Sequence, residues 1–295
     1  MKLFLAHRKT FWADAGLFYA AAIWGSTFFI VKDALSGIDP VVLVAYRFLL
    51  AGVLLLLFLL LRGTPPKTGW FRALFLSLIL WSLYISQTVG LKYTTASNAG
   101  FITGLFVLFT PLLLLVIFRR KPTVIEAVAS GMSVAGLWVL TGGLSDMNVG
   151  DSLMIIAALA YALHVLYSDK YMKAGVDPYQ ISCQQFLLVG GLSLLTALVL
   201  DLPLSIASEK IAWIVVFLAL APTLSAFVIQ MLAQRITSPV KVTLIFAFEP
   251  VFAALFAWTL GDEQIVVHRA LGGLLIVLAL ALSGIKFPLK PKHQG

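Results

Sequence analysis

Residues 37–52 read GIDPVVLVAYRFLLAG, and residues 175–190 read GVDPYQISCQQFLLVG. The first glycine, the Asp-Pro pair and the string Phe-Leu-Leu-x-Gly thus return in one constant register, in which position 37 matches position 175 and position 52 matches position 190. We call this register the repeat offset. Aspartate caps the free amides at the start of a helix and proline fits the first helical position, so each copy predicts a helix start. Leucine matches mean little in an apolar chain, but this string is specific and indicates an internal duplication.

The composition is that of a protein with an apolar exterior. Of the 295 residues, 61% are hydrophobic and 12% are charged, and the mean hydropathy is +1.00. Soluble domains carry about 25% charged residues, so the outer surface is predicted to face a lipid bilayer. The net charge of +8 lies in short basic clusters between long apolar runs, which argues against nucleic acid as a partner.

Ten apolar runs reach the ~20 residues that are needed to cross ~30 Å of hydrocarbon. The first run is interpreted as a retained helix rather than a cleaved signal peptide, because Trp24-Gly25-Ser26 interrupts it and no convincing cleavage site follows. We therefore expect an all-α integral membrane protein. The ten predicted transmembrane helices cover residues 13–34, 40–61, 71–91, 96–118, 124–142, 151–170, 178–200, 211–233, 239–260 and 266–286.

The distribution of lysine and arginine predicts the orientation. With the N-terminus inside, 16 of these residues lie in inside segments and 4 in outside segments, and Arg47 lies within a span. Cytoplasmic loops carry the excess of basic residues in membrane proteins. Both termini are therefore predicted to be cytoplasmic.

The duplication divides the chain into two predicted five-helix units, residues 12–142 and residues 151–286. Because five is an odd number, the second unit enters the membrane from the opposite side, as in the inverted repeats of secondary transporters. Two units related by a pseudo-two-fold axis in the membrane plane can exchange conformations. Such an exchange converts an inward-open state into an outward-open one.

Four stretches carry a family resemblance: AAIWGSTF at residues 21–28, RFLLAG at 47–52, GLKYTTASNAGFITGL at 90–105, and FEPVFAA at 248–254 together with Gly261-Asp262-Glu263. They resemble EamA-type transporters of the drug/metabolite transporter superfamily, and the resemblance covers essentially residues 12–286. It implies ten helices around a central cavity. It also implies the carriage of amino acids, other metabolites or drugs, often as export.

The expected function is secondary-active transport of small organic metabolites, such as amino acids or amphipathic compounds, by alternating access and in the direction of export. The sequence has no glycine-rich phosphate loop, so ATP is not expected to drive transport. Protons are a candidate coupling ion, and a monomer and a homodimer both fit the sequence. The expected location is a bacterial-type plasma (inner) membrane, crossed several times.

A membrane-embedded enzyme and a channel with no transport cycle are the two alternative classes. The four histidines, His7, His164, His268 and His293, lie far apart, and neither His-Glu-x-x-His nor Gly-x-Ser-x-Gly occurs. No repeated filter sequence indicates a channel. We therefore expect a protein that is not an enzyme and that needs no cofactor or metal.

Ionisable residues deep in the predicted spans carry most of the functional information, because a charge at mid-membrane costs about 2.5–3.5 kcal/mol. Arg47 either faces a cavity or a buried partner, or extends toward the outer headgroups. Glu249 is either a structural anchor that bonds an amide freed beside Pro250, or a substrate or proton site. His164 is either a packing residue or a cavity residue.

The duplication aligns polar residues at matched depth. The aligned sets are Ser26 with His164, Tyr46-Arg47 with Gln184-Gln185, and Thr110-Pro111 with Glu249-Pro250. A cavity on the pseudo-two-fold axis would be lined in this way, and deep aromatic side chains would suit amphipathic solutes. The candidate substrate-binding residues are Trp24, Ser26, Arg47, Tyr84, Tyr161, His164, Gln184, Gln185 and Glu249.

Prolines within the spans predict where helices break. Pro111 and Pro250 each remove a backbone hydrogen bond, and matched breaks near the midplane point to a transport site. Pro222 has no matched proline in the first half, so it is interpreted as an ordinary kink.

Overall fold

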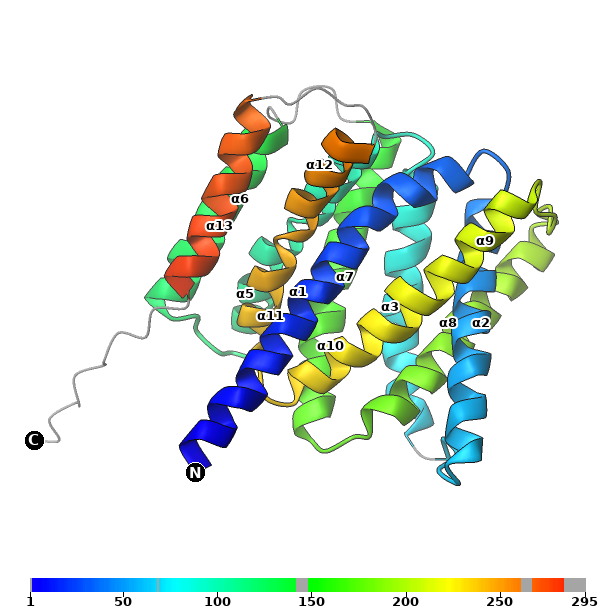
Figure 1. Cartoon of the computed structure of the whole chain (residues 1–295), viewed down its shortest axis with the longest axis horizontal. Helices are drawn as coiled ribbons and strands as arrows, with labels where there is room; N and C mark the ends of the chain where they lie inside the picture. Colours follow the sequence, from blue (N-terminus) through cyan, green and yellow to red (C-terminus); the bar gives the residue numbers. More distant parts are fainter. Residues whose placement is uncertain (1, 68, 142–147, 261–266, 284–295) are drawn as a thin grey trace, which may run out of the picture.

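The computed structural model of the chain describes residues 2–67, 69–141, 148–260 and 267–283, and all regular elements in these ranges are helices (Figure 1). The elements are α1 (Lys2–Ala34), α2 (Pro40–Leu61), α3 (Trp70–Gly90), α4 (Ala96–Thr103), α5 (Phe106–Val116), α6 (Val124–Thr141), α7 (Val149–Lys173), α8 (Pro178–Val199), α9 (Glu209–Leu218), the π-helix η1 (Ala219–Ser225), α10 (Ala226–Gln234), α11 (Pro239–Phe246), α12 (Glu249–Leu260) and α13 (Val267–Ser283). The prediction of an all-α fold is confirmed.

Seven helical segments in the described ranges are long and apolar enough to cross a membrane, and they fall on seven of the ten predicted spans. The segments are Thr10–Ala34, Pro40–Leu61, Trp70–Gly90, Asn98–Val116, Val149–Lys173, Pro178–Val199 and Glu209–Gln234. Two further predicted spans hold the shorter apolar helices Val124–Gly136 and Ala270–Ala279. The remaining predicted span, residues 239–260, is divided into α11 and α12. The total of ten spans therefore stays a prediction.

A few sequence predictions lie outside the described residues. They concern the string Gly261-Asp262-Glu263, the last residue of the predicted span 124–142, and both ends of the predicted span 266–286.

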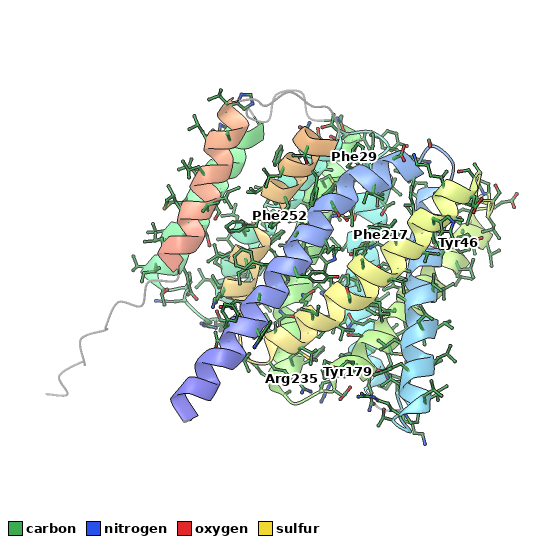
Figure 2. The ribbon with its side chains drawn as sticks, viewed as in Figure 1. Phe29, Tyr46, Tyr179, Phe217, Arg235 and Phe252 are labelled. Atoms are coloured by element: carbon green, nitrogen blue, oxygen red, sulfur yellow. The ribbon has the colours of Figure 1, made fainter. Side chains whose placement is uncertain are left out.

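The helices run between two faces of the molecule (Figure 1). We call the face where α1 begins the N-terminal face; the α2–α3, α7–α8 and α10–α11 connections lie on it, at the bottom of Figure 1. The opposite face holds the α1–α2, α3–α4 and α8–α9 connections. Figure 2 shows Tyr179 and Arg235 toward the N-terminal face, and Tyr46 toward the opposite face.

The two Asp-Pro pairs start helices, as predicted from the repeated string. The Asp39 side chain accepts a hydrogen bond from the Val41 amide at the start of α2, and Asp177 accepts one from the Gln180 amide at the start of α8. Proline occupies the first helical turn in both cases.

The α2 and α8 helices pack along each other, and the glycines that end the repeated string permit their close approach. A Cβ atom on Gly190 would lie 2.7 Å from the backbone nitrogen of Leu49, and one on Gly52 would lie 3.0 Å from that of Leu187. Small residues allow membrane helices to approach in this way. The contact is reciprocal, because the repeat offset relates Gly52 to Gly190 and Leu49 to Leu187.

Three predicted spans are interrupted, and only one interruption lies beside a proline that was predicted to break its helix. Pro250 is the second residue of α12, directly after the break at Ala247 and Phe248. Pro111 instead lies inside α5, so its prediction as a helix break is wrong. The neighbouring break falls at Gly104 and Leu105, between α4 and α5.

The third interruption is the π-helix η1, which contains Pro222. Pro222 has no N–H to donate to the Leu218 carbonyl, and the Thr223 hydroxyl donates to that oxygen instead, at 2.8 Å. Pro222 is therefore more than an ordinary kink, because it reorganises a full turn of the helix.

Candidate functional site

An aromatic cluster joins α1, α7, α10 and α11 in the interior. The Trp24 ring lies 5.1 Å from Phe227 and 4.9 Å from Phe246, measured between centroids, and 6.1 Å from Tyr161. Its neighbours are tilted or edge-on to it, the geometry that aromatic pairs prefer. Tyr84 of α3 extends the cluster, with its ring centroid 6.0 Å from that of Phe227.

The π-helix supplies hydrogen-bonding groups to this cluster. The Trp24 indole N–H donates to the Pro222 carbonyl at 2.7 Å. The Arg47 Nε donates to the Thr223 hydroxyl at 3.0 Å, and that hydroxyl in turn donates to the Leu218 carbonyl. The Leu218 carbonyl is thus connected, through Thr223, to the one basic side chain predicted to lie within a span.

Arg47 is held inside the protein rather than extended toward the headgroups. Its residue is 3% exposed, and its guanidinium carbon lies 4.8 Å from the Tyr84 ring centroid. A guanidinium over an aromatic face gains cation–π attraction, which is stronger where water is excluded. Of the two interpretations of Arg47, the buried contact is the one observed.

Glu249 lies at the first position of α12 and is 4% exposed. The Tyr161 hydroxyl donates to its Oε2 at 3.5 Å, which is long for a hydrogen bond. A carboxylate at a helix N-terminus is also stabilised by the helix dipole. Among the ion pairs of the described residues, none joins Glu249 to Arg47.

Gly25 brings α1 against the start of α12. A Cβ atom at this position would lie 2.5 Å from the Glu249 carbonyl oxygen and 2.7 Å from the Cβ of Phe252, which Figure 2 labels on α12. Only glycine permits this contact. The Trp-Gly pair therefore has two physical roles, a hydrogen bond to η1 and close packing beside Glu249.

These groups surround one internal cavity with a free volume of about 20 Å³, enough for little more than a water molecule. Its walls must therefore move before an organic solute can bind. The cavity is lined by Trp24, Thr27, Leu83, Tyr84, Gln87, Tyr161, Phe227 and Glu249.

The structure thus brings four of the nine candidate substrate-binding residues to the cavity: Trp24, Tyr84, Tyr161 and Glu249. Arg47 reaches the same cluster through Tyr84. Sequence reasoning missed Thr27, Gln87, Leu83 and Phe227 as cavity residues. Thr27 and Gln87 carried a usable signal, as polar residues within predicted spans, whereas Phe227 and Leu83 carried none.

The other four candidates lie outside the cavity lining. His164 Nε2 lies 2.8 Å from Gln185 Oε1, and the His164 ring packs edge-on to Phe227. The Ser26 hydroxyl bonds the Ile23 carbonyl of its own helix. Gln184 lies toward the N-terminal face, where its Nε2 donates to the Pro66 carbonyl at 3.2 Å.

A larger pocket of about 590 Å³ opens on the N-terminal face, and we call it the vestibule. It is lined by Gly69, Trp70, Phe71, Arg72, Ala174, Gly175, Val176, Asp177, Gln180, Ile181 and Gln184. These residues belong to the start of α3 and to the α7–α8 connection with the first turns of α8. Within the described part of the chain, no three or more His, Cys, Asp or Glu side chains are grouped as metal ligands.

Comparison with known proteins identifies the family. The model of the EamA-like transporter family matches residues 11–142 and again residues 148–285. The chain belongs to the EamA-like transporter family. It is therefore a multi-pass membrane protein of a transporter family, as the resemblance implied.

Relatives of this EamA-family chain carry similar names. It is 31% identical to an uncharacterized transporter of Archaeoglobus fulgidus, over 94% of this chain and 87% of the relative. It is 29% identical to the uncharacterized inner membrane transporter YedA of Escherichia coli, over 93% and 92%. A solved crystal structure with 19% identity matches with a TM-score of 0.79, over 92% of this chain and 97% of that one, which shows the shared fold.

Proposed function

We propose that this EamA-family chain is a secondary-active transporter that exports small organic metabolites, such as amino acids or amphipathic compounds, by alternating access. The observation that carries the proposal is the buried aromatic cavity with a carboxylate, Glu249, in its wall and no cation paired to it among the described residues. Export is the direction that the family resemblance implies. The proposal holds equally for a monomer and for a homodimer.

The chemistry of the cavity supports a particular range of solutes. Aromatic walls favour an apolar or aromatic body, and Glu249 offers a partner for an amine. Arg47 is bound to Thr223 and Tyr84, so little positive charge is left for a multiply charged anion. We therefore propose neutral, zwitterionic or amphipathic substrates rather than nucleotide sugars or phosphate esters.

A pair of reciprocal hydrogen bonds supports the inverted repeat of residues 12–142 and 151–286. The Tyr46 hydroxyl donates to the Leu204 carbonyl at 2.7 Å, and Gln184 Nε2 donates to the Pro66 carbonyl at 3.2 Å. The repeat offset relates the two donors and also the two acceptors, with their halves exchanged. A two-fold relation between the halves would generate this pattern, and alternating access follows from such a relation.

The distribution of basic residues supports a cytoplasmic N-terminal face and an inner-membrane location. Reporter fusions after Lys67, Lys121 and Lys173 should score cytoplasmic, and a fusion near Asp39 should score external. Fusions after Lys290 should score cytoplasmic and those near Asp146 and Asp262 external, although these three positions lie outside the described residues. An external score after Lys121 would contradict the proposed orientation.

Transport is tested with purified protein in proteoliposomes. A panel of amino acids and amphipathic cations is offered with and without a pH gradient, and saturable uptake with counterflow is expected for at least one of them. Rapid exchange of a sugar nucleotide would contradict the substrate class. Flux without saturation would favour a channel, and formation of a chemical product would favour an enzyme.

A further inference from the structure

Two contacts join the halves of the chain on the opposite face. The Lys210 ammonium lies 2.7 Å from the Asp33 carboxylate, and the Ala207 amide donates to the Gly37 carbonyl at 3.0 Å. Gly37 is packed so closely that a Cβ there would lie 2.8 Å from the Cβ of Ala207 and nearer still to a methyl group of Ile211. We call the pairs Asp33–Lys210 and Gly37–Ala207 the latch.

The positions that the repeat offset relates to the latch lie on the N-terminal face. Asp33 corresponds to Tyr171 and Lys210 to Arg72, and here the guanidinium carbon lies 5.8 Å from the Tyr171 ring centroid. The N-terminal face thus has a cation–π contact at the positions where the latch has an ion pair.

The positions that correspond to Gly37 and Ala207 border open space. Gly37 corresponds to Gly175 and Ala207 to Gly69, and both of these glycines line the vestibule. A Cβ on Gly175 would meet no atom within 4 Å. The vestibule thus occupies the place that the Gly37–Ala207 contact fills on the opposite face.

A lysine near the end of the first helix of each half shows the same difference between the two faces. On the opposite face, Lys32 donates to the carbonyls of Leu91 and Thr94, which ties α1 to the α3–α4 connection. The side chain of its counterpart Lys170 is exposed, its ammonium lies 5.9 Å from the Tyr167 ring centroid, and it forms no hydrogen bond or ion pair with another described residue. At these two places the N-terminal face has fewer contacts than the opposite face, although a 2.7 Å ion pair between Lys241 and Asp14 also joins the two halves at the start of α11.

The hydrogen bonds of Tyr46 and Gln184 are made on both faces, at 2.7 and 3.2 Å. In the sequence, Tyr46 and Gln184 lie between the ends of their helices and the glycines Gly52 and Gly190, where α2 and α8 pack together. These two bonds therefore do not distinguish the two faces.

We infer that the latch and the vestibule are the two matched positions of one gate: when the latch opens, Arg72 and Tyr171 draw together and the vestibule closes. This inference rests on the proposed alternating access. The latch ion pair has exposed side chains, 73% for Lys210 and 45% for Asp33, so salt and water weaken it. A weak contact suits a latch that must open once in every cycle.

The test measures access to the vestibule, so that it does not depend on finding a substrate. The single cysteine, Cys183, is replaced by Ala, and Gln180→Cys is introduced in the vestibule lining. A membrane-impermeant maleimide then reports the labelling rate from the N-terminal face. Lys210→Gln should lower this rate about threefold, because the loss of the latch shifts the population toward the closed vestibule.

Lys92→Gln is the matched control. It removes another ion pair on the opposite face, Lys92–Asp39, but one that lies within the first half and does not join the two halves. The labelling rate should be unchanged. An equal decrease of the labelling rate in both variants, or no decrease in either variant, would overturn the gate.

A second variant locks the latch. Cysteines at Asp33 and Lys210, again with Cys183→Ala, should be joined by a short bis-methanethiosulfonate, because the two exposed side chains meet. Transport should then fall at least tenfold and recover when a reductant cleaves the cross-link. Full transport by the cross-linked protein would overturn the gate, whereas absence of transport by the Cys183→Ala parent would instead contradict the proposed function.

Discussion

Arg47 and Glu249 are both charged, both buried and both close to the same aromatic cluster, but their surroundings differ. Arg47 has a 3.0 Å hydrogen bond to Thr223 and lies against the Tyr84 ring, outside the cavity lining. Glu249 has a 3.5 Å hydrogen bond from Tyr161 and lines the cavity. Burial of a charge therefore does not by itself mark a binding group. The number and quality of its fixed partners separate a structural charge from one that is available to a solute or a proton.

The largest effect is expected for Arg47→Met, which removes the charge-assisted hydrogen bond and leaves Thr223 and Tyr84 without their partner. The loss of folding free energy should be about 3 kcal/mol, because buried polar partners are left unsatisfied. Thermal unfolding in detergent measures it. Arg62→Met, at the exposed end of α2, is the control and should change stability little. Equal stability of the two variants would contradict a structural role for Arg47.

Glu249→Gln tests whether the second buried charge is available to a solute or a proton. The amide keeps the shape and can still accept from Tyr161, so stability should change by less than about 1 kcal/mol. Transport should fall about tenfold or more and lose most of its pH dependence, because an amide cannot exchange a proton in this range. Proteoliposome flux at several pH values measures both.

The exposed Glu209 provides the matched control for Glu249. Its Oε1 accepts a hydrogen bond from the indole of Trp213 at the surface, so Glu209→Gln should leave flux and pH profile unchanged. If Glu249→Gln also keeps full activity and an unchanged profile, Glu249 is a helix anchor at most. If it mainly lowers expression and melting temperature, the anchor role replaces the coupling role.

Trp24→Phe tests the link between the cluster and the π-helix. It removes the 2.7 Å hydrogen bond to the Pro222 carbonyl but keeps most of the aromatic contact, so about 1 kcal/mol of stability should be lost. Trp213→Phe, whose indole lies at the surface, should cost less. Chemical unfolding of the two variants decides whether the indole bond matters.

The smallest effect separates two adjacent hydroxyls of α1. Thr27 and Ser26 each donate to a carbonyl of their own helix at 2.6 Å, but only Thr27 lines the cavity. Thr27→Val should change the apparent affinity for substrate about threefold, and Ser26→Ala should leave it unchanged. The reverse result would support Ser26, the residue that the sequence predicted, as the substrate-binding residue.

Hydropathy and the Asp-Pro pairs predicted the helices, because span length and capping are local properties that a sequence carries directly. The aromatic residues and Glu249 were also predictable, since large or charged groups inside a membrane helix need an interior partner. Ser26 was chosen because the duplication aligns it with His164. Adjacent residues differ by about 100° around a helix and the sequence does not give the rotation of α1, so Thr27 was missed.

The helix breaks were harder to predict. A proline removes a hydrogen bond, but the surrounding helices decide whether the backbone opens there, and α5 accommodates Pro111 without a break. Pro222 was set aside because it has no counterpart in the first half. Its effect depends on Thr223 and Arg47, which lie 176 residues apart in the chain, so only the folded structure connects them.

The π-helix η1 has a consequence for insertions and deletions in this region. A π turn accommodates one more residue than an α turn between the same two helix ends. Deleting one residue from Ala219–Ser225 would therefore allow an uninterrupted α-helix between the same two ends. Conversion of this segment to α-helical turns without a deletion would instead rotate every residue after it by about 100° relative to α9. Phe227 would then turn away from Trp24, and the Pro222 carbonyl would lose its indole partner. In this segment, the length of the chain determines the geometry of the cavity wall as much as the identity of its residues.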